Sequence, residues 1–306
     1  MQTRCRSSRY SKMRLHSVDR LVLGTAQFGS AYGVANRSGR VPDDELGAIL
    51  RRAAEAGIAT IDTAPSYGDC EKRLGEIGVD GWRIVSKLPE LPLPCSDPGS
   101  WVRSEVSAIL ERLALTSLHG LLIHRPEQLL GPEGARIFQA LEDLQVQQVV
   151  AKIGVSVYGP EDLEALWPTY RFDLVQCPLS IVDRRFVASG CLERLGAEGV
   201  EVHTRSAFLQ GLLLMRPDER PATFQKWQSV FDRLDAWVLE QSMTPVQACL
   251  AYPLSCPEVD HVVVGVDNSR HLEQILDSLG QSPLEFPAAL ASEDLDLVNP
   301  TRWPTP

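Results

Sequence analysis

Four side chains that can hold or transfer a proton stand at or just beyond the ends of short apolar runs. Asp62, Lys87 and His124 each close or follow one of these runs, and Tyr67 lies five positions beyond Asp62. Runs this short are typical of buried strands. Barrel and doubly wound α/β folds carry their chemistry at the carboxyl ends of such strands. We therefore expect the four side chains to meet at one end of a parallel sheet.

Acid–base chemistry is what these residue types support. A buried carboxylate is costly unless a cation pairs with it, and Lys87 is the nearest candidate downstream of Asp62. A tyrosine, whose pKa is ordinarily about 10, is a poor acid near pH 7 unless a cation stabilises its anion. Alone, each residue also has a structural interpretation as an ion pair, a loop aromatic or a strand cap. The four together favour a catalytic interpretation.

The rest of the chain supplies the elements that would position these residues. Short apolar runs alternate with amphipathic helical segments, and no two consecutive runs are joined by a hairpin turn. The count of eight strand-then-helix units predicts an α/β fold, a single-domain (β/α)8 TIM barrel over residues 18–282. The first predicted strand and its loop cover residues 20–26, and the other predicted strands cover residues 57–61, 83–86, 119–123, 149–155, 172–176, 200–204 and 261–264. The predicted helices cover residues 42–56, 69–77, 100–113 (with Ser100 as its cap), 133–147, 160–166, 184–196, 221–241, 245–251 and 269–279.

A series of short motifs carries a family resemblance. In chain order they are Asp62-Thr63-Ala64-Pro65-Ser66-Tyr67-Gly68 with Glu71 and Leu74-Gly75-Glu76, Ser86-Lys87, Ile123-His124-Arg125-Pro126-Glu127, Lys152-Ile153-Gly154-Val155-Ser156, Gln176-Cys177-Pro178, Arg205-Ser206-Ala207-Phe208-Leu209-Gln210-Gly211-Leu212 and Val262-Val263-Val264-Gly265. Each motif is weak alone. In this order, over roughly residues 20 to 280, they resemble the motifs of the aldo-keto reductases, a family of single barrels of about 250 residues.

The resemblance implies hydride transfer between a nicotinamide and a carbonyl. A hydride that reaches the carbonyl carbon leaves charge on the oxygen, so the site needs a proton donor. Tyr67 would be the general acid in reduction and the base in oxidation, assisted by Lys87 and Asp62. His124 would polarise and orient the carbonyl oxygen. The implied function is NAD(P)H-dependent reduction of an aldehyde or ketone, including a sugar or sugar-derived carbonyl, to an alcohol.

The resemblance also implies NADP(H) as cofactor, with NAD(H) as the alternative, bound on the barrel itself. Ser156 and Gln176 match the family's carboxamide anchors, whereas Val157 stands where an Asn is expected. Relatives often stack an aromatic on the nicotinamide at the position of Arg205, and we expect its guanidinium to stack there and to disfavour the cationic oxidised ring. The predicted cofactor contacts are Gly24, Thr25, Asp62, Ser156, Gln176, Arg205, Phe208, Gln210, Gly211, Gly265, Asn268, Arg270 and Gln274.

The loop after the eighth predicted strand is the expected site of the adenosine phosphate, because it opens a helix and helix N-termini bind anions. Arg270 would supply positive charge there, although a solvated helix residue is an equal interpretation. Asp267 argues against a phosphate. The preference between NADP and NAD therefore stays open.

The composition of the chain argues against several other classes of protein. The net charge of −10, with no basic stripe beyond the first twenty residues, argues against nucleic acid. Seven cysteines without paired spacing indicate a reduced, cytoplasmic protein, and neither they nor the six histidines show the spacing of a metal site. No apolar run reaches the ~18 residues of a membrane span. The expected partner is a small-molecule carbonyl substrate, and the expected state is a monomer or weak homo-oligomer.

The two ends of the chain fall outside the predicted barrel. Residues 1–17 are basic and polar, which predicts a disordered leader or an upstream start with Met13 as the real one, with a mitochondrial address as a further alternative. Residues 283–306 predict an irregular tail that packs on the barrel.

Two other functions are weighed against the reductase. A non-catalytic NADP(H)-binding sensor on the same barrel fits the departures at Val157 and Arg205, but the complete Asp62, Tyr67, Lys87 and His124 set speaks against it. A metal-dependent barrel hydrolase or lyase would need spaced His, Asp or Glu ligands at the strand ends, and the sequence shows none.

Overall fold

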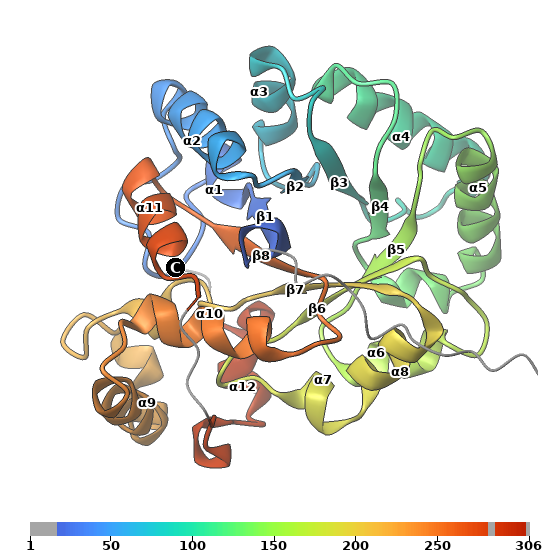
Figure 1. Ribbon diagram of the computed structural model, residues 1–306. Helices are drawn as coiled ribbons and strands as arrows, with labels where there is room; N and C mark the ends of the chain where they lie inside the picture. Colours follow the sequence, from blue (N-terminus) through green and yellow to red (C-terminus); the bar gives the residue numbers. More distant parts are fainter. Residues whose placement is uncertain (1–16, 281–284, 304–306) are drawn as a thin grey trace, which may run out of the picture.

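The computed structural model of the chain describes residues 17–280 and 285–303. Within them eight parallel strands close into one barrel in sequence order, with β8 pairing back onto β1. Figure 1 shows the strands at the centre and the helices around them. The chain is a single (β/α)8 TIM barrel, as the alternation of strand and helix patterns predicted.

The barrel strands are short, as expected of the apolar runs. They are β1 Leu21–Gly24, β2 Thr60–Asp62, β3 Arg83–Leu88, β4 Gly120–Ile123, β5 Ile153–Ser156, β6 Leu174–Pro178, β7 Glu201–Arg205 and β8 His261–Gly265. Residues 20–26, predicted as the first strand and its loop, contain β1, and Ala26 begins the short helix α1. The fifth and sixth were predicted to begin too early, since pairing in β5 and β6 starts at Ile153 and Leu174.

Helices connect the strands on the outside of the barrel. They are α1 Ala26–Gly29, α2 Asp43–Ala56, α3 Cys70–Ile77, α4 Pro98–Leu113, α5 Gly134–Val146, α6 Pro160–Leu166, α7 Arg185–Ala188, α8 Cys191–Glu198, α9 Gln228–Glu240, α10 Pro245–Ser255, α11 Ser269–Asp277 and α12 Leu295–Val298. Short 3-10 turns lie at Ser17–Arg20, Pro126–Leu129, Leu212–Leu214, Ala222–Trp227, Ala288–Leu290 and Pro300–Arg302.

Two helix predictions need correction. Asp97, not Ser100, is the N-cap of α4: its carboxylate accepts from the Ser100 N–H, which makes Ser100 the capped residue. The predicted helix 184–196 is two helices, α7 and α8. Gly190 separates them with φ of 76°, a left-handed conformation that a continuous helix cannot contain.

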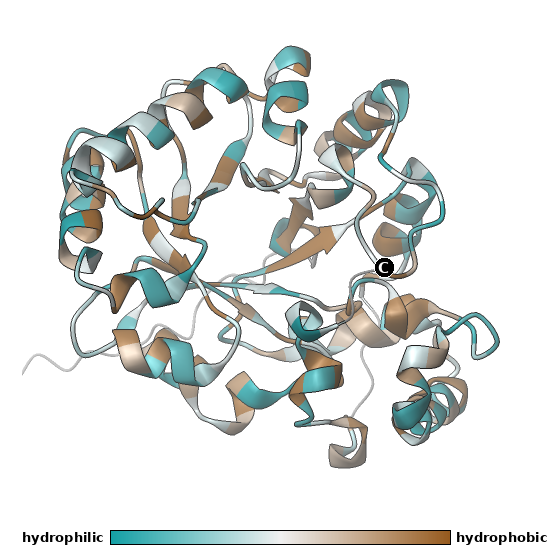
Figure 2. Cartoon of the chain, turned by 180° about the vertical axis from the view of Figure 1, so that it is seen from behind, coloured by the Kyte–Doolittle hydropathy of each residue, from teal (hydrophilic) through white to brown (hydrophobic). Residues whose placement is uncertain are grey.

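The hydrophobic core has two parts. The larger part fills the layer between strands and helices, and Figure 2 shows hydrophobic residues concentrated on the strands and hydrophilic ones on the outer faces of the helices. A smaller cluster of Val85, Leu122 and Leu174 forms a separate group. Successive side chains on a strand alternate between the two faces. Each of the three precedes a polar site residue by two positions, so this cluster lies inside the barrel, one level below the polar end.

The two ends of the chain were also predicted. The disordered leader predicted for residues 1–17 lies almost wholly outside the described residues. Residues 285–303 lie against α9 and the loop after β6: Trp227 Nε1 donates to Asp294 at 2.8 Å, and Ser292 N donates to Val182 O at 2.8 Å. Leu297 and Val298 are buried there.

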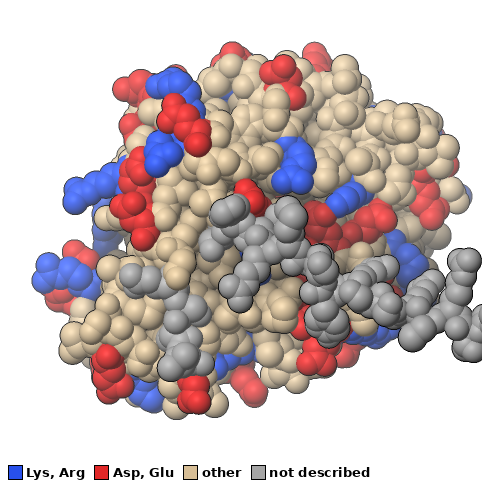
Figure 3. Space-filling model, in the orientation of Figure 1, with Lys and Arg blue, Asp and Glu red and all other residues tan. Residues whose placement is uncertain are grey.

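The surface and the cysteines bear on the other sequence predictions. On the face in Figure 3, acidic and basic side chains are interspersed over the part drawn in colour. Six cysteines of the described chain are free. Among the helices in that part of the chain, none is long and apolar enough to cross a membrane.

Candidate active site

An ion pair lies at the carboxyl ends of β2 and β3. Asp62 is the last residue of β2 and pairs with Val85, so Lys87 lies two positions further along β3 on the same face of the sheet. The Lys87 Nζ lies 2.6 Å from Asp62 Oδ1, and only 1% and 5% of the two side chains are exposed. Because a buried charge without a partner is very costly, each residue is what makes the other tolerable.

Lys87 donates hydrogen bonds to several groups of the site. Its ammonium donates to Asp62 and, at 3.0 Å, to the Thr63 carbonyl, and it hydrogen-bonds the Tyr67 side chain. Burial lowers the pKa of Lys87, but the charge of Asp62 and the contact with Tyr67 more than offset this, and the net pKa is raised. Lys87 is therefore a cation at neutral pH.

Tyr67 is held in place by close backbone packing. It lies in the loop after β2, with Lys87 Nζ 5.1 Å from the centre of its ring. Gly29 packs on this loop so closely that a Cβ would fall 1.5 Å from the Tyr67 carbonyl oxygen. Gly68 has φ of 62°, and a Cβ there would fall 2.4 Å from Gly29 O. Only glycine fits both positions, so this contact orients the loop that carries Tyr67.

The pKa of Tyr67 is raised, although a neighbouring cation was expected to make this tyrosine a better acid. Burial raises its pKa above the ordinary value, and this exceeds the opposing effect of Lys87; Asp62 adds to the rise. Lys87 thus limits the cost of a tyrosinate without producing one at rest. Tyr67 is protonated at neutral pH, which is the form that a proton donor needs.

His124 follows the last residue of β4 and is half-buried. Burial lowers its pKa to about 3, helped by the positive charge of Lys87. At neutral pH the imidazole is therefore neutral, with one nitrogen able to donate a hydrogen bond.

A chain of side-chain hydrogen bonds continues from Asp62 across the barrel. Gln176 Nε2 donates to the second oxygen of Asp62 at 2.7 Å, and Ser156 Oγ donates to Gln176 Oε1 at 3.1 Å. Register pairing of Ser156 with Gln176 on β5 and β6 brings these two together. The two predicted carboxamide anchors are thereby connected to the ion pair.

Arg205 ends β7 at the same mouth of the barrel. Its guanidinium donates to the Val157 carbonyl at 3.0 Å and lies 4.7 Å from the centre of the Tyr158 ring. The predicted stacking on a nicotinamide stays a prediction, because the guanidinium here is engaged by the loop after β5. Val157, which stands where an Asn was expected, holds the Arg205 guanidinium through its backbone carbonyl.

A cavity of about 1050 Å³ opens at this end of the barrel. It extends from Asp62, Tyr67 and Gln176 at the barrel mouth to Gln274 and Ser278 on α11 and just after it. The predicted cofactor contacts that line it are Gly24, Thr25, Asp62, Gln176, Arg205, Phe208, Gln210, Gly211, Gly265 and Gln274.

Three predicted contacts are not part of this lining. Ser156 lies behind Gln176. Asn268 uses its side chain to cap α11, accepting from His271 N at 2.9 Å, and Arg270 is exposed on the helix surface. The Ser269 N–H is bonded by the Glu45 carboxylate. The start of α11 is therefore already occupied by a protein carboxylate and by its own cap.

The loop after β1, whose residues 28–32 were expected near the mouth, also contributes Ala35 and Asn36, which the sequence did not assign. Asn36 Nδ2 reaches across to Asp267 at 3.2 Å, Ala35 N donates to Gln210 O at 3.4 Å, and Gln210 Nε2 lies 3.4 Å from the Tyr32 hydroxyl. This loop bridges those after β7 and β8 along the cavity. The only signal in the sequence was the spacing of glycines after the first strand, which indicates irregular backbone but not its destination.

Comparison with known sequences agrees with this geometry. The profile of the Aldo/keto reductase family matches residues 20–286. The chain is 28% identical to a D-threo-aldose 1-dehydrogenase from a Pseudomonas species, over 90% of this chain and 94% of that protein. It is 31% identical to a 6-dehydroglucose reductase from Novosphingobium aromaticivorans over 42% of this chain and 46% of that one.

Solved structures show the same fold. The aldo-keto reductase AKR11C1 from Bacillus halodurans, in its holo form, superposes with a TM-score of 0.70 at 18% identity, over 87% of this chain and 88% of that one. The glycerol dehydrogenase AKR11B4 from Gluconobacter oxydans superposes with a TM-score of 0.67 at 21% identity, over 86% and 87%. A profile match over most of the barrel, together with this polar mouth, places the chain in the aldo/keto reductase family, as an NAD(P)-dependent oxidoreductase.

Proposed function

We propose that this enzyme transfers hydride between a nicotinamide cofactor and the carbonyl carbon of a small sugar or polyol-derived substrate. The observation that carries the proposal is the buried chain Asp62–Lys87–Tyr67 at the inner end of the cavity. Two relatives are named for sugars, an aldose dehydrogenase and a dehydroglucose reductase, which supports this substrate class.

The residues of the cavity fit a dinucleotide. The cavity extends from the barrel mouth to α11, and Gln176 lies beside the ion pair, where it could hold a carboxamide. When bound, the nicotinamide cofactor supplies or accepts the hydride. Tyr67 donates its hydroxyl proton to the substrate oxygen in reduction, and Lys87 stabilises the tyrosinate that remains. Neutral His124 donates a hydrogen bond that orients the substrate oxygen.

The test is steady-state kinetics with a panel of aldoses, glycerol-derived aldehydes and aromatic aldehydes, in both directions and with both cofactors. We expect the highest kcat/KM for a hydroxylated substrate. Arg205 and Tyr32 place a guanidinium and a phenol hydroxyl in the cavity lining, where the hydroxyl groups of a sugar could hydrogen-bond with them. Turnover of aromatic aldehydes alone would reject the sugar class and leave the reductase assignment standing.

The pKa shifts at the site predict a specific pH profile. Tyr67 has a raised pKa, so the reduction rate should be flat through neutral pH and fall only in the alkaline range as the proton donor is lost. The oxidation rate should rise over the same alkaline range, because there the tyrosinate is the active form. The pKa of His124, about 3, predicts no transition from this residue between pH 5 and 8. A limb near pH 6.5 in kcat that disappears in His124→Gln would contradict this.

We further propose NAD(H) as the preferred cofactor, in place of the NADP(H) favoured by the family resemblance alone. The carboxylates of Asp218, Glu219, Asp267 and Asp277 line the cavity, and Arg37 is the one arginine or lysine among its described lining residues besides Arg205. Asp267 is bonded by Asn36 and lies 3.7 Å from His271. Burial already raises the pKa of Asp267, and a 2′-phosphate beside it would add repulsion.

Cofactor titrations of purified protein test this preference. Two unit charges about 4 Å apart repel by about 4 kcal/mol at an effective dielectric near 20, and solvent reduces this considerably. We therefore expect NADH to bind at least about tenfold more tightly than NADPH, a difference of about 1.4 kcal/mol. Asp267→Ser should narrow the ratio, whereas Arg270→Ala, at an exposed residue outside the lining, should not change it. Tighter binding of NADPH, abolished by Arg37→Ala, would reverse the assignment.

Location and assembly stay proposals of the same kind. The six free cysteines support a reducing, cytoplasmic compartment. We retain the monomer or weak homo-oligomer predicted from sequence, which sedimentation of the purified protein would test.

A further inference from the structure

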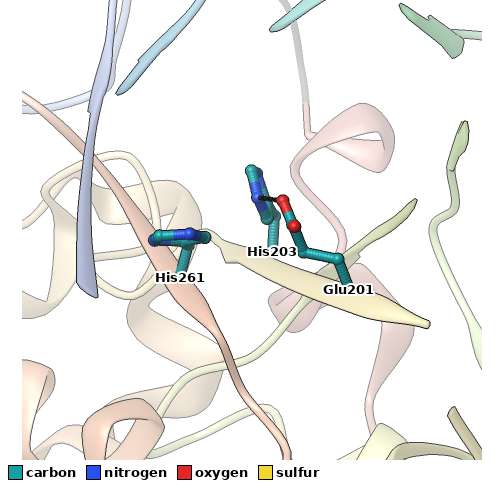
Figure 4. Close-up of side chains that lie close together, drawn as sticks. All are labelled: Glu201, His203 and His261. Atoms are coloured by element: carbon teal, nitrogen blue, oxygen red, sulfur yellow. Dashed lines mark hydrogen bonds and ion pairs between the residues drawn. The ribbon is translucent and has the colours of Figure 1, made fainter. Parts of the chain in front are cut away.

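A cluster of one carboxylate and two imidazoles lies at the opposite end of the barrel, where the strands begin. Glu201 and His203 are on β7 and His261 is the first residue of β8. Each offers one ligand atom, and these atoms all lie within 4.8 Å of one another. Figure 4 shows Glu201 and His203 side by side on β7, with His261 next to them on β8. We call these three residues the floor cluster.

Strand register creates the floor cluster. His203 pairs with His261 across β7 and β8, and Glu201 shares the face of His203 because side chains alternate along a strand. Arg205, two positions beyond His203, lines the cofactor cavity, so this face of β7 points into the barrel. The sequence prediction of no metal site relied on spacing alone. The histidines are 58 positions apart and become neighbours only in the closed sheet.

The hydrogen bonds of the floor cluster leave two buried nitrogens without a partner. His203 is fully buried, and its Nε2 lies 2.8 Å from Glu201 Oε1. Because an ionised carboxylate only accepts, Nε2 carries the proton and Nδ1 carries a free lone pair. Nδ1 of His203 and Nδ1 of His261 have no hydrogen-bond partner, although buried polar atoms nearly always have one.

This arrangement is the one that metal-binding histidines use. A ligating imidazole usually donates its other N–H to a carboxylate, which fixes the tautomer and orients the ring. Glu201 does this for His203, while its second oxygen is engaged by Lys152. The two rings lie 4.8 Å apart between centroids at 76°, close enough to share one ion.

We propose that the floor cluster binds a single divalent transition metal ion of the zinc type, with His203 and His261 as nitrogen ligands. Glu201 either orients His203 or moves Oε1 onto the ion. Bonds of about 2.0–2.1 Å in a tetrahedral site put ligand atoms roughly 3.3 Å apart, so the most widely separated atoms need to close by up to about 1.5 Å. Nitrogen ligands select Zn²⁺, Co²⁺ or Ni²⁺ over Mg²⁺ and Ca²⁺, which prefer oxygen.

Charge and access set the limits of this site. Lys152 forms an ion pair with Glu201, so positive charge is already present beside the proposed ion. We therefore expect weaker binding than at a site with several carboxylates. The side chains of Lys152 and Glu201 are 31% and 18% exposed, which provides a route from solvent.

The floor cluster is separate from the catalytic end. The apolar group of Val85, Leu122 and Leu174 lies inside the barrel, and none of the floor residues lines the cofactor cavity. An ion there would join β7 to β8 and stabilise the closed barrel without contacting the substrate. Its loss should therefore lower thermal stability more than it lowers kcat.

The test is titration of the metal-free full-length protein with Co²⁺ and Zn²⁺ under reducing conditions. We expect one equivalent of Co²⁺ to give the visible absorption bands of a four-coordinate site with nitrogen ligands, and Zn²⁺ to displace it. At about 100-fold excess over Kd, Zn²⁺ should raise Tm by about 5 °C. His203→Gln and His261→Gln should each weaken binding at least tenfold, whereas His271→Gln, a remote and half-exposed histidine, should bind as wild type.

Two results would overturn the proposal. One is the absence of cobalt bands and of a Zn²⁺-dependent rise in Tm in the wild type; the floor cluster would then be a polar network completed by water. The other is binding that His261→Gln leaves intact but Cys256→Ser abolishes, which would place the ion on a thiol. If His203→Gln fails to fold, the wild-type spectrum and His261→Gln still decide, with NADH binding as the check that each variant is folded.

Discussion

Replacing Tyr67 with phenylalanine should lower kcat for carbonyl reduction by about 10²- to 10⁴-fold, the usual contribution of a general acid. The substitution removes one oxygen atom from a hydroxyl whose side-chain partner is Lys87. It keeps the ring, and the Gly29–Gly68 contact that orients the loop is made by backbone. We therefore expect normal folding and NADH binding within a factor of two, measured by calorimetry, alongside the loss of turnover.

A second tyrosine gives the matched control for this experiment. Tyr170 is buried, its hydroxyl donates to the Leu129 carbonyl at 2.9 Å, and neither residue belongs to the cavity lining. Tyr170→Phe should cost about 1 kcal/mol of stability, as a lost hydrogen bond does, and leave kcat unchanged. Equal losses of kcat in the two variants would mean that Tyr67→Phe acts through folding, and near-normal turnover in Tyr67→Phe would assign the proton to another group.

The barrel could be predicted from the sequence because its signals are local. Runs such as Leu121–Ile123, each followed by a helical pattern, occur eight times, and parallel strands joined by helices close readily into a barrel. The predicted ends of the elements were less accurate. The Gly190 break in the helix after β6 and the Asp97 cap of α4 depend on single backbone conformations, which several nearby residues could have supplied.

Placement of the site residues was predictable to the extent that they sit on strands. Asp62 and Lys87 meet because adjacent parallel strands put their carboxyl ends together, and Gln176 joins them by the same rule. Loop residues follow no such rule. The contact of Asn36 with Asp267 and the engagement of Arg205 by Val157 depend on where the loops after β1 and β5 travel, and no periodicity encodes that.

The electrostatics depended on burial, which sequence shows only in part. Lys87 was expected to make Tyr67 a better acid, and it does oppose the rise in the Tyr67 pKa. Yet burial of the ring has the larger effect. In the same way, Arg270 was the cation sought for an adenosine phosphate. The structure leaves it exposed and puts Glu45 on the start of α11 instead.

The Asp62–Lys87 pair should link stability and activity in a way that single and double variants can separate. Lys87→Met leaves the Asp62 carboxylate buried, with the amide of Gln176 as its remaining side-chain donor among the described residues. Breaking a buried pair in this way typically costs about 3–5 kcal/mol. For a barrel of this size the melting temperature should fall by about 5–8 °C. Turnover should be lost too, because Tyr67 then has no cation to stabilise its anion.

The double variant Asp62→Asn with Lys87→Met should recover part of that stability, because it removes the unpaired charge. It should recover none of the activity. The reason is that stability requires only that no unpaired charge is buried, whereas proton transfer requires the ammonium group of Lys87. Chemical denaturation and kcat measured on Asp62→Asn, Lys87→Met and the double variant form the cycle. The exposed pair of Lys72 and Glu76, 3.7 Å apart, is the control, and Lys72→Met should change stability by no more than about 0.5 kcal/mol. A double variant as unstable as Lys87→Met would show that the lysine acts through its aliphatic packing. Recovered turnover in the double variant would show that catalysis does not require the Lys87 ammonium.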